Sequence, residues 1–191
     1  MKTIAITGGI GAGKSVVSTV LRLMGYYVFD CDAEAKAIMD GSDAIKTALV
    51  THIHEKAVVD GVIDRRLIAG VVFSDAAKLD KLNAIIHEAV RLRLSQVIAE
   101  RSKTDSRIFV ETAILYQSGL DRMVDEVWDV VAEDEIRIAR VMKRNDATRD
   151  DVIARIESQR FIPDTLHPNV HEINNDGFTA VIPQLLALLH K

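Results

Sequence analysis

Residues Gly8 to Ser15 read GGIGAGKS and match the pattern G-x-x-x-x-G-K-S/T of a phosphate-binding loop. Glycines in such a loop let consecutive backbone N–H groups point at one anion, and the helix that follows adds partial positive charge. Lys14 supplies an ammonium group for the β- and γ-phosphates, and the Ser15 hydroxyl supplies a ligand for Mg²⁺. A turn that only joined a strand to a helix would require neither Lys14 nor the additional glycines. The loop therefore predicts that the chain binds a nucleoside triphosphate with Mg²⁺.

A second candidate group is the carboxylate of Asp32, which follows the short apolar stretch Tyr26–Phe29. In a parallel α/β sheet, the carboxyl ends of the strands face the ligand crevice. A carboxylate there can accept the proton of an acceptor hydroxyl or orient that hydroxyl for in-line attack. Asp32 can equally cap a helix that begins at Ala33. From spacing alone, both roles stay open.

A third candidate group consists of basic residues in and just before the segment Lys143–Arg149, between two predicted helices. Arg140 and Arg144 are four residues apart, so both side chains can face one side of a helix. The planar guanidinium binds two oxygens at once, which suits a phosphoryl group during transfer. This pattern is typical of a lid over a nucleotide. The competing interpretation is an ordinary solvated helix face.

Three classes of phosphate-loop protein, namely GTP switches, molecular motors and small-molecule kinases, differ in the further motifs that they require. A GTP switch normally carries D-x-x-G and N-K-x-D, and neither pattern occurs in the chain. A molecular motor normally has an apolar strand that ends in two acids, whereas Ile108–Glu111 ends in one. A small-molecule kinase needs an acceptor-binding region, a lid with arginines and a carboxylate near the acceptor hydroxyl. The sequence offers all of these features and therefore favours a kinase.

Alternating strands and helices are needed to position these groups, and the apolar pattern predicts them. Strands are predicted at Lys2–Thr7, Tyr26–Phe29, Ile108–Thr112 and Val127–Ala132, with a weaker one at Val170–Asn174. Helices are predicted after the loop, with Val16, Val17, Val20, Leu21 and Met24 on one face, and at Ala113–Gly119, Glu135–Arg144, Arg149–Phe161 and Phe178–His190. This order predicts a three-layer α/β/α fold with a parallel sheet, of the P-loop nucleoside-triphosphate hydrolase type.

The segment 33–102 is almost wholly helical in pattern and is too long for a simple crossover. Within it, Asp43–His52 and a long helix after Ser74-Asp75 are predicted, with a turn near Asp60-Gly61. We therefore predict a single kinase domain over 1–191, with a nucleotide-binding core of 1–32 and 103–191, a helical acceptor-binding insertion at 33–102 and a lid at 140–160.

Composition excludes several other classes of protein. The chain has 191 residues and a net charge of −4, from 24 Lys and Arg against 28 Asp and Glu. This balance is a poor match to a binder of duplex DNA, although it leaves room for a local basic patch. Its only cysteine, Cys31, cannot form an internal disulfide and fits a reducing compartment. No apolar run is long enough for a membrane span, and the histidines are too scattered for a metal site made by protein ligands alone. We therefore expect a cytoplasmic protein without a nucleic-acid or membrane partner, either a monomer or a small homo-oligomer.

Over essentially the full chain, the residues resemble the dephospho-coenzyme A kinase family. The matching segments are the phosphate loop with Ala12 where serine is usual, Asp32-Ala33-Glu34, Arg66-Leu67 with Val72-Phe73, Leu82-Asn83 with His87, Arg140 to Arg149, Arg155-Ile156 with Gln159, and Ile173 to Gly177. The chain departs from the family pattern at Glu88 and Ala113, where proline is usual, at Gln117, where an acid often follows, and at His171-Glu172.

The resemblance implies that ATP phosphorylates the ribose 3′-hydroxyl of 3′-dephospho-coenzyme A, giving coenzyme A and ADP. It implies that the catalytic residues are Asp32, Lys14, Arg140 and Arg144. It implies that ATP is bound by Gly9, Gly11, Ala12, Gly13, Lys14, Ser15 and Val16, with Asn175 near the adenine and Mg²⁺ on Ser15. It further implies that Thr7, Asp32, Arg66 and His87 bind the acceptor, although a helical histidine such as His87 is, by itself, more often a packing or surface residue. The alternatives are a kinase of a nucleoside monophosphate or another small metabolite, and a nucleotide-binding regulator without turnover.

Overall fold

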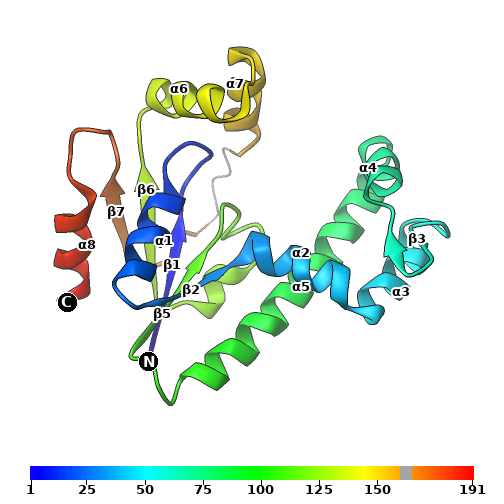
Figure 1. Ribbon diagram of the computed structural model, residues 1–191, viewed down its shortest axis with the longest axis horizontal. Coiled ribbons are helices and arrows are strands. Elements are labelled where there is room, and N and C mark those ends of the chain that lie inside the picture. The colour runs from blue at the N-terminus through cyan, green and yellow to red at the C-terminus, as the bar shows by residue number, and fades with distance from the viewer. Residues whose placement is uncertain (160–164) are drawn as a thin grey trace. The chain divides into compact units, whose positions relative to one another are not determined.

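The computed structural model describes residues 1–159 and 165–191, and its chain forms two compact units (Figure 1). The first, which we call the sheet unit, comprises Met1–Asp30 and Arg101–Lys191. The second, which we call the helical unit, comprises Cys31–Glu100. Within the described residues, no helix has both the length and the apolar character that crossing a membrane requires.

The sheet unit is built on five strands in the order β2-β5-β1-β6-β7, and every neighbouring pair is parallel. The strands are β1 (Lys2–Thr7), β2 (Tyr27–Asp30), β5 (Arg107–Glu111), β6 (Glu126–Val131) and β7 (Val170–Asn174). These segments are rich in β-branched and aromatic residues, which pack well on a pleated surface that is covered on both faces. The predicted parallel α/β fold is confirmed, including the strand at Val170–Asn174. Because all strands run the same way, their carboxyl ends share one edge of the sheet.

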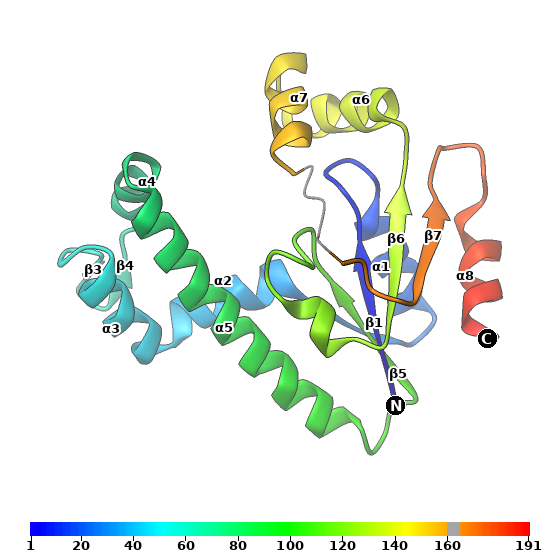
Figure 2. The same cartoon turned by 180° about the vertical axis from the view of Figure 1, so that it is seen from behind.

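Helices surround this sheet, as Figure 2 shows from behind. They are α1 (Lys14–Leu23), α6 (Asp134–Asn145), α7 (Arg149–Ser158) and α8 (Val181–Leu189), with a short 3₁₀ helix η1 (Leu120–Met123). In place of the helix predicted at Ala113–Gly119, the structure has turns that lead to η1, so that prediction is wrong. Gly119 adopts a left-handed φ of +69°, which an α-helix does not accommodate.

Two other predicted helix boundaries differ from the structure. The last helix begins at Val181 and not at Phe178, because Asp176 Oδ1 accepts hydrogen bonds from the N–H groups of Phe178 (2.8 Å) and Thr179 (2.6 Å). These bonds form an Asx turn in place of a first helical turn. Helix α7 ends at Ser158, and the last two residues of the prediction, 160 and 161, lie outside the described residues.

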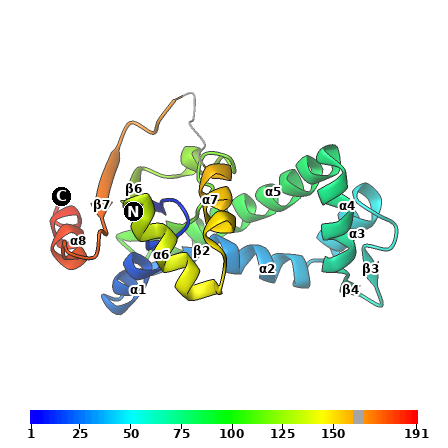
Figure 3. The same cartoon turned by 90° about the horizontal axis from the view of Figure 1, so that it is seen from above.

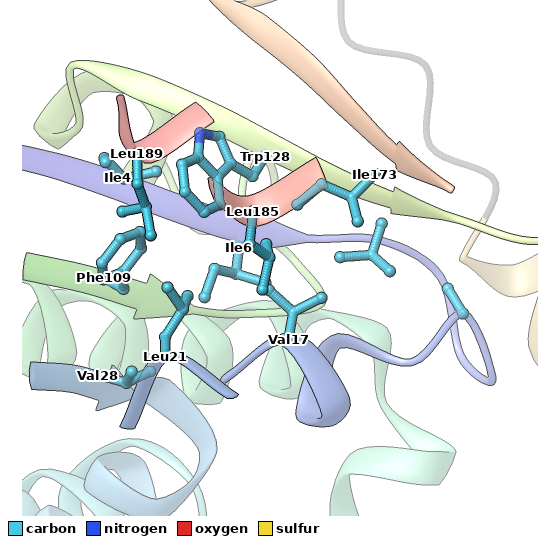
Figure 4. Close-up of a cluster of buried hydrophobic side chains, with 12 residues drawn as sticks. Ile4, Ile6, Val17, Leu21, Val28, Phe109, Trp128, Ile173, Leu185 and Leu189 are labelled. Carbon is cyan, nitrogen blue, oxygen red and sulfur yellow. The ribbon is translucent and has the colours of Figure 1, made fainter. Parts of the chain in front are cut away.

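The main core of the sheet unit lies between the sheet and helices α1 and α8 (Figure 4). Trp128 and Phe109 are fully buried there, with ring centroids 5.1 Å apart. Large buried side chains of this kind stabilise a fold by about 1.5–3 kcal/mol each. Helix α1 contributes Val17 and Leu21, which are four residues apart and share a face. Val16, predicted on that apolar face, is instead 49% exposed because it lies one residue, about 100° of helical rotation, away from Val17.

The helical unit, whose elements are labelled in Figure 3, has a hydrophobic core of its own. Its elements are α2 (Cys31–Gly41), α3 (Asp43–His52), the antiparallel hairpin β3 (Val58–Val59) and β4 (Val62–Ile63), α4 (Arg65–Ser74) and α5 (Ala76–Arg101), whose last residue falls in the sheet unit. Leu49, Ile53 and Ile68 are among the buried residues that hold the unit together. Asp75 caps α5 through the N–H of Lys78 at 3.1 Å, so the predicted start of the long helix is confirmed.

Candidate active site

The phosphate loop leaves the carboxyl end of β1 and returns into α1 at Lys14. Gly13 precedes the helix with a left-handed φ of +102°, a conformation that side chains with a Cβ rarely adopt. The ammonium group of Lys14 folds back over the loop and donates to the carbonyl oxygens of Gly8 at 2.7 Å and Gly9 at 3.3 Å. The lysine is therefore already held at the loop, where a phosphate would meet it.

Asn175 supports the loop from the segment that follows β7. Its backbone N–H donates to Val131 O at 2.9 Å, which places the residue at the sheet edge. Its buried side-chain amide donates to Ala12 O at 2.7 Å, and a Cβ on Gly13 would collide with that amide. The structure thus brings Asn175 to the phosphate loop through a direct contact, whereas its contact with adenine stays a prediction.

Two arginines of α6 also contact the loop. The guanidinium of Arg140 lies 3.4 Å from Gly11 O and 3.5 Å from Ala12 O. One turn earlier, Arg137 donates from Nε to Ile10 O at 2.9 Å and pairs with Asp134 at 2.8 Å. Arg137 is not among the site residues predicted from the sequence. The available signal was its spacing of three residues from Arg140, which places both on one face of the helix.

The far end of the α6–α7 pair also contacts the loop, through Gln159. Its side-chain oxygen accepts the backbone N–H of Ile10 at 2.7 Å. The Ile10 side chain packs against a small apolar cluster that α6 and α7 build from Ile138, Val141, Val152 and Ile156. In the sequence, Gln159 is predicted only as part of the family pattern, and this contact of its side chain is not predicted.

A further carboxylate, that of Asp129, lies close enough to Lys14 and Arg137 to feel their charges, and it is not among the residues predicted from the sequence. It lies on β6, opposite Thr7 of β1 and Glu172 of β7 in the sheet register. Burial raises the pKa of Asp129 and the negative charge of Glu172 adds to the rise, while the positive charges of Lys14 and Arg137 oppose it. An acid in the middle of the apolar run Val127–Val131 was the signal that could have identified it.

Comparison with known proteins then identifies the family. A family model described as dephospho-CoA kinase matches residues 2–180. The chain belongs to the dephospho-CoA kinase family. It is therefore a kinase, an enzyme that transfers a phosphoryl group from ATP.

Individual relatives of the dephospho-CoA kinase family match the chain over nearly its whole length. A protein of Geobacillus kaustophilus named dephospho-CoA kinase is 35% identical, with 98% of this chain and 94% of the relative covered. One of the same name from Bacteroides fragilis is 34% identical over 97% of this chain and 90% of its own.

Solved structures show the same fold. A crystal structure of a Thermus thermophilus protein has a TM-score of 0.79 at 32% identity, covering 99% of this chain and 96% of that one. A dephospho-CoA kinase from Campylobacter jejuni has a TM-score of 0.70 at 20% identity, with 98% and 95% covered. The second likeness supports the fold alone.

Arg144, a predicted catalytic residue, is exposed near the end of α6. Its Nε donates to Asn145 Oδ1 at 3.1 Å. Of the two arginines that the dephospho-CoA kinase pattern singles out, the structure thus brings Arg140 to the loop, while Arg144 pairs with its own neighbour. The helix ends one residue later at Asn145, and the following residue, Asp146, takes a left-handed φ of +50°.

The predicted acceptor residues of the helical unit lie on three separate helices. Asp32 is in the first turn of α2, which begins directly after β2, so its charge is well placed at the positive end of that helix. Arg66 is exposed in the first turn of α4. His87 is half-buried on α5, and burial together with the charge of Arg91 lowers its pKa below the usual 6.5. These placements leave the acceptor roles as predictions.

The residues at the start of α1 fit a magnesium ion that arrives with the nucleotide. Ser15 is exposed next to Lys14 and offers a hard oxygen ligand. Within residues 1–159 and 165–191, no group of three or more His, Cys, Asp and Glu side chains could hold a metal. Mg²⁺ is commonly bound by one or two protein ligands together with substrate phosphates and water, and Ser15 suits that arrangement.

Proposed function

We propose that this chain transfers the γ-phosphoryl group of ATP to the ribose 3′-hydroxyl of 3′-dephospho-coenzyme A, giving coenzyme A and ADP. The observation that carries this proposal is the family match over residues 2–180, because it spans the helical unit as well as the phosphate loop. A phosphate loop alone would support any nucleotide-dependent kinase. The single cysteine fits the cytoplasm as the site of the reaction.

In this proposal the phosphate loop binds the triphosphate of ATP. The Lys14 ammonium holds the β- and γ-phosphates together with backbone N–H groups of the loop, and Ser15 is the protein ligand of Mg²⁺. The residues that contribute these N–H groups are Gly9, Gly11, Ala12, Gly13, Lys14, Ser15 and Val16. The bound ion would neutralise charge that develops on the phosphate oxygens. The contact of Lys14 with the Gly8 carbonyl supports its part, because the ammonium is already at the loop.

The same proposal assigns the reacting hydroxyl to Asp32. The carboxylate orients the 3′-hydroxyl and takes its proton as the oxygen attacks the γ-phosphorus. A bond from that oxygen to phosphorus forms, the bond from phosphorus to the β–γ bridging oxygen breaks, and ADP leaves. Thr7, Arg66 and His87 are the further acceptor residues, and the insertion at 33–102 is the acceptor-binding region.

Residues 140–160, which include the second half of α6 and all of α7, are proposed to be the lid, and residue 160 lies outside the described residues. Arg140 and Arg144 would screen the negative charge of the phosphoryl group during transfer. Arg140 already lies beside the Gly11 and Ala12 carbonyl groups, which supports its part. Closure of the lid would exclude water and limit wasteful hydrolysis of ATP.

The deciding experiment is a coupled ADP-release assay on the purified full chain with several acceptors. We expect selective turnover with 3′-dephospho-coenzyme A over nucleoside monophosphates and shikimate-like acceptors. Selective turnover of a nucleoside monophosphate would replace the proposed acceptor. Tight nucleotide binding without ADP formation in the presence of any of these acceptors would support a regulator without turnover. Size-exclusion chromatography with light scattering would decide between a monomer and a small homo-oligomer.

A further inference from the structure

The tip of the phosphate loop is held by two side chains of the α6–α7 pair. Both backbone polar groups of Ile10 form hydrogen bonds to these side chains. The Ile10 N–H donates to Gln159 Oε1 at 2.7 Å, and the Ile10 C=O accepts from Arg137 Nε at 2.9 Å. Arg137 is in turn fixed by Asp134 at 2.8 Å, and this arginine has a side chain that is only 15% exposed. A partly buried hydrogen bond to a charged donor is stronger than an exposed neutral one. Ile10 is therefore clamped at both polar atoms.

Packing reinforces this clamp. The Ile10 side chain joins the apolar cluster between α6 and α7, so the loop tip is anchored by apolar contact as well as by hydrogen bonds. Figure 1 shows α6 and α7 beyond the carboxyl end of β1, next to the loop that follows it. Since α6 and α7 contribute both the polar and the apolar partners, displacing this pair would release the loop tip.

The glycines at the tip show how close α6 comes. The general loop pattern requires Gly8 and Gly13 but leaves positions 9 and 11 open. A Cβ on Gly9 would collide with the Arg137 guanidinium, and one on Gly11 would lie 2.6 Å from the backbone oxygen of Arg137. Gly11 also has a left-handed φ of +79°. These two glycines therefore accommodate α6 in addition to the phosphate.

We propose that Arg137 and Gln159 are positioning residues that hold the phosphate loop in its nucleotide-binding shape through the peptide groups of Ile10. The loop shape then depends on the α6–α7 pair being in place, so nucleotide affinity and the position of this pair are coupled. A loop that is already in its binding shape loses less conformational freedom when the phosphates arrive. That these two residues contribute to catalysis rests on the proposed kinase function, but the test of their effect on the loop needs only a nucleotide.

The test compares Arg137→Met, Gln159→Met and the double variant in the full chain, with binding of ADP and Mg²⁺ measured by calorimetry. Each single variant should bind ADP about fivefold more weakly, since one hydrogen bond of this kind contributes about 1 kcal/mol and 1.4 kcal/mol is tenfold. The double variant should lose less than the product of the two single losses, because both act on the same residue. Hydrogen exchange of the amides in residues 8–13 should be faster in all three variants.

Arg107→Met is the matched control. Arg107 also donates to a backbone carbonyl, that of Leu189 at 2.6 Å, but from the first residue of β5, at the edge opposite the loop. This variant should lower the melting temperature and leave ADP affinity within about twofold of the unchanged chain. Gln159→Glu keeps an acceptor oxygen and should restore slow exchange of the Ile10 amide, which a general loss of stability would not allow.

The proposal would be overturned if both single variants bound ADP as the unchanged chain does, with unaltered exchange in residues 8–13. Independent, multiplicative losses in the double variant would also contradict it. Should Arg137→Met not fold, the pair Gln159→Met and Gln159→Glu carries the test by itself. Because ADP binding requires no acceptor, failure of the proposed acceptor chemistry would leave these results unaffected.

Discussion

The sheet unit and the helical unit hold their candidate residues in different ways. In the sheet unit, Lys14 of the loop itself hydrogen-bonds to the loop backbone, and so do Asn175 and Arg137 from distant parts of the chain. In the helical unit, Asp32 and Arg66 lie in the first turns of two different helices, and His87 lies within a third. A nucleotide site built on fixed backbone contacts is preorganised, whereas side chains on separate helices depend on how those helices pack.

The largest effect is expected from Lys14→Ala in the sheet unit. Loss of the ammonium group removes a fixed positive charge from the phosphates, and the transfer rate should fall by about 10³-fold or more. Steady-state kinetics with ATP and 3′-dephospho-coenzyme A measure it. Activity that survives the substitution intact would contradict the interpretation of the loop.

The corresponding substitution in the helical unit is Asp32→Asn. Removal of the proton acceptor should lower kcat by about 10²-fold or more while leaving the KM for ATP nearly unchanged. If Asp32 only caps α2, the loss would appear in the melting temperature and kcat would fall less than about threefold. This result decides whether the helical unit contributes a reacting group.

Gly11→Ala tests how tightly the sheet unit is built around the loop. The added Cβ would meet the Arg137 backbone oxygen at 2.6 Å, so ADP affinity should fall by about tenfold, with a stability loss of about 1–3 kcal/mol. Gly25→Ala is the control, because Gly25 also has a positive φ of +90° but open space around it. Its variant should lose stability and keep ADP affinity; equal ADP affinities in the two variants would argue against the close approach of α6.

Asp129→Asn should stabilise the chain at neutral pH. The folded-state pKa of Asp129 is raised, so ionisation above the usual 3.8 costs the folded state more than the unfolded state. The gain in free energy of unfolding should be full at neutral pH and shrink as the pH falls through the raised folded pKa toward 3.8. Urea unfolding of both proteins over a pH series measures it. A gain that does not change with pH would point to packing and not to charge.

The smallest effect is expected from His87 in the helical unit, with the opposite pH dependence. Its folded-state pKa lies below 6.5, so as the pH falls through 6.5 the unfolded chain takes up the proton first and stability is lost. His87→Gln should reduce this loss between neutral and mildly acidic pH, as followed by thermal unfolding. Identical pH profiles for the two proteins would contradict the lowered pKa of the half-buried His87.

Prediction from the sequence succeeded where the signal is local and failed where a turn competes with a helix. The five strands of the parallel sheet and most helices follow from short apolar patterns, and both ends of α3 lie at the predicted residues. At Ala113–Gly119 the pattern looked helical, but hydrogen bonds from the Ser118 hydroxyl to the carbonyl groups of Ile114 and Leu115, with Gly119 in a left-handed conformation, accompany a set of turns.

The loop GGIGAGKS and the order of strands and helices were readable in the linear chain, because glycine placement and apolar periodicity are properties of neighbouring residues. The partners of Ile10 were not readable in this way. Arg137 and Gln159 lie 127 and 149 residues away from it, and Asn175 lies 163 residues from Ala12. No local pattern predicts contacts over such separations. The packing of α6 and α7 brings Arg137 and Gln159 to the loop, and the place of β7 in the parallel sheet brings Asn175 there.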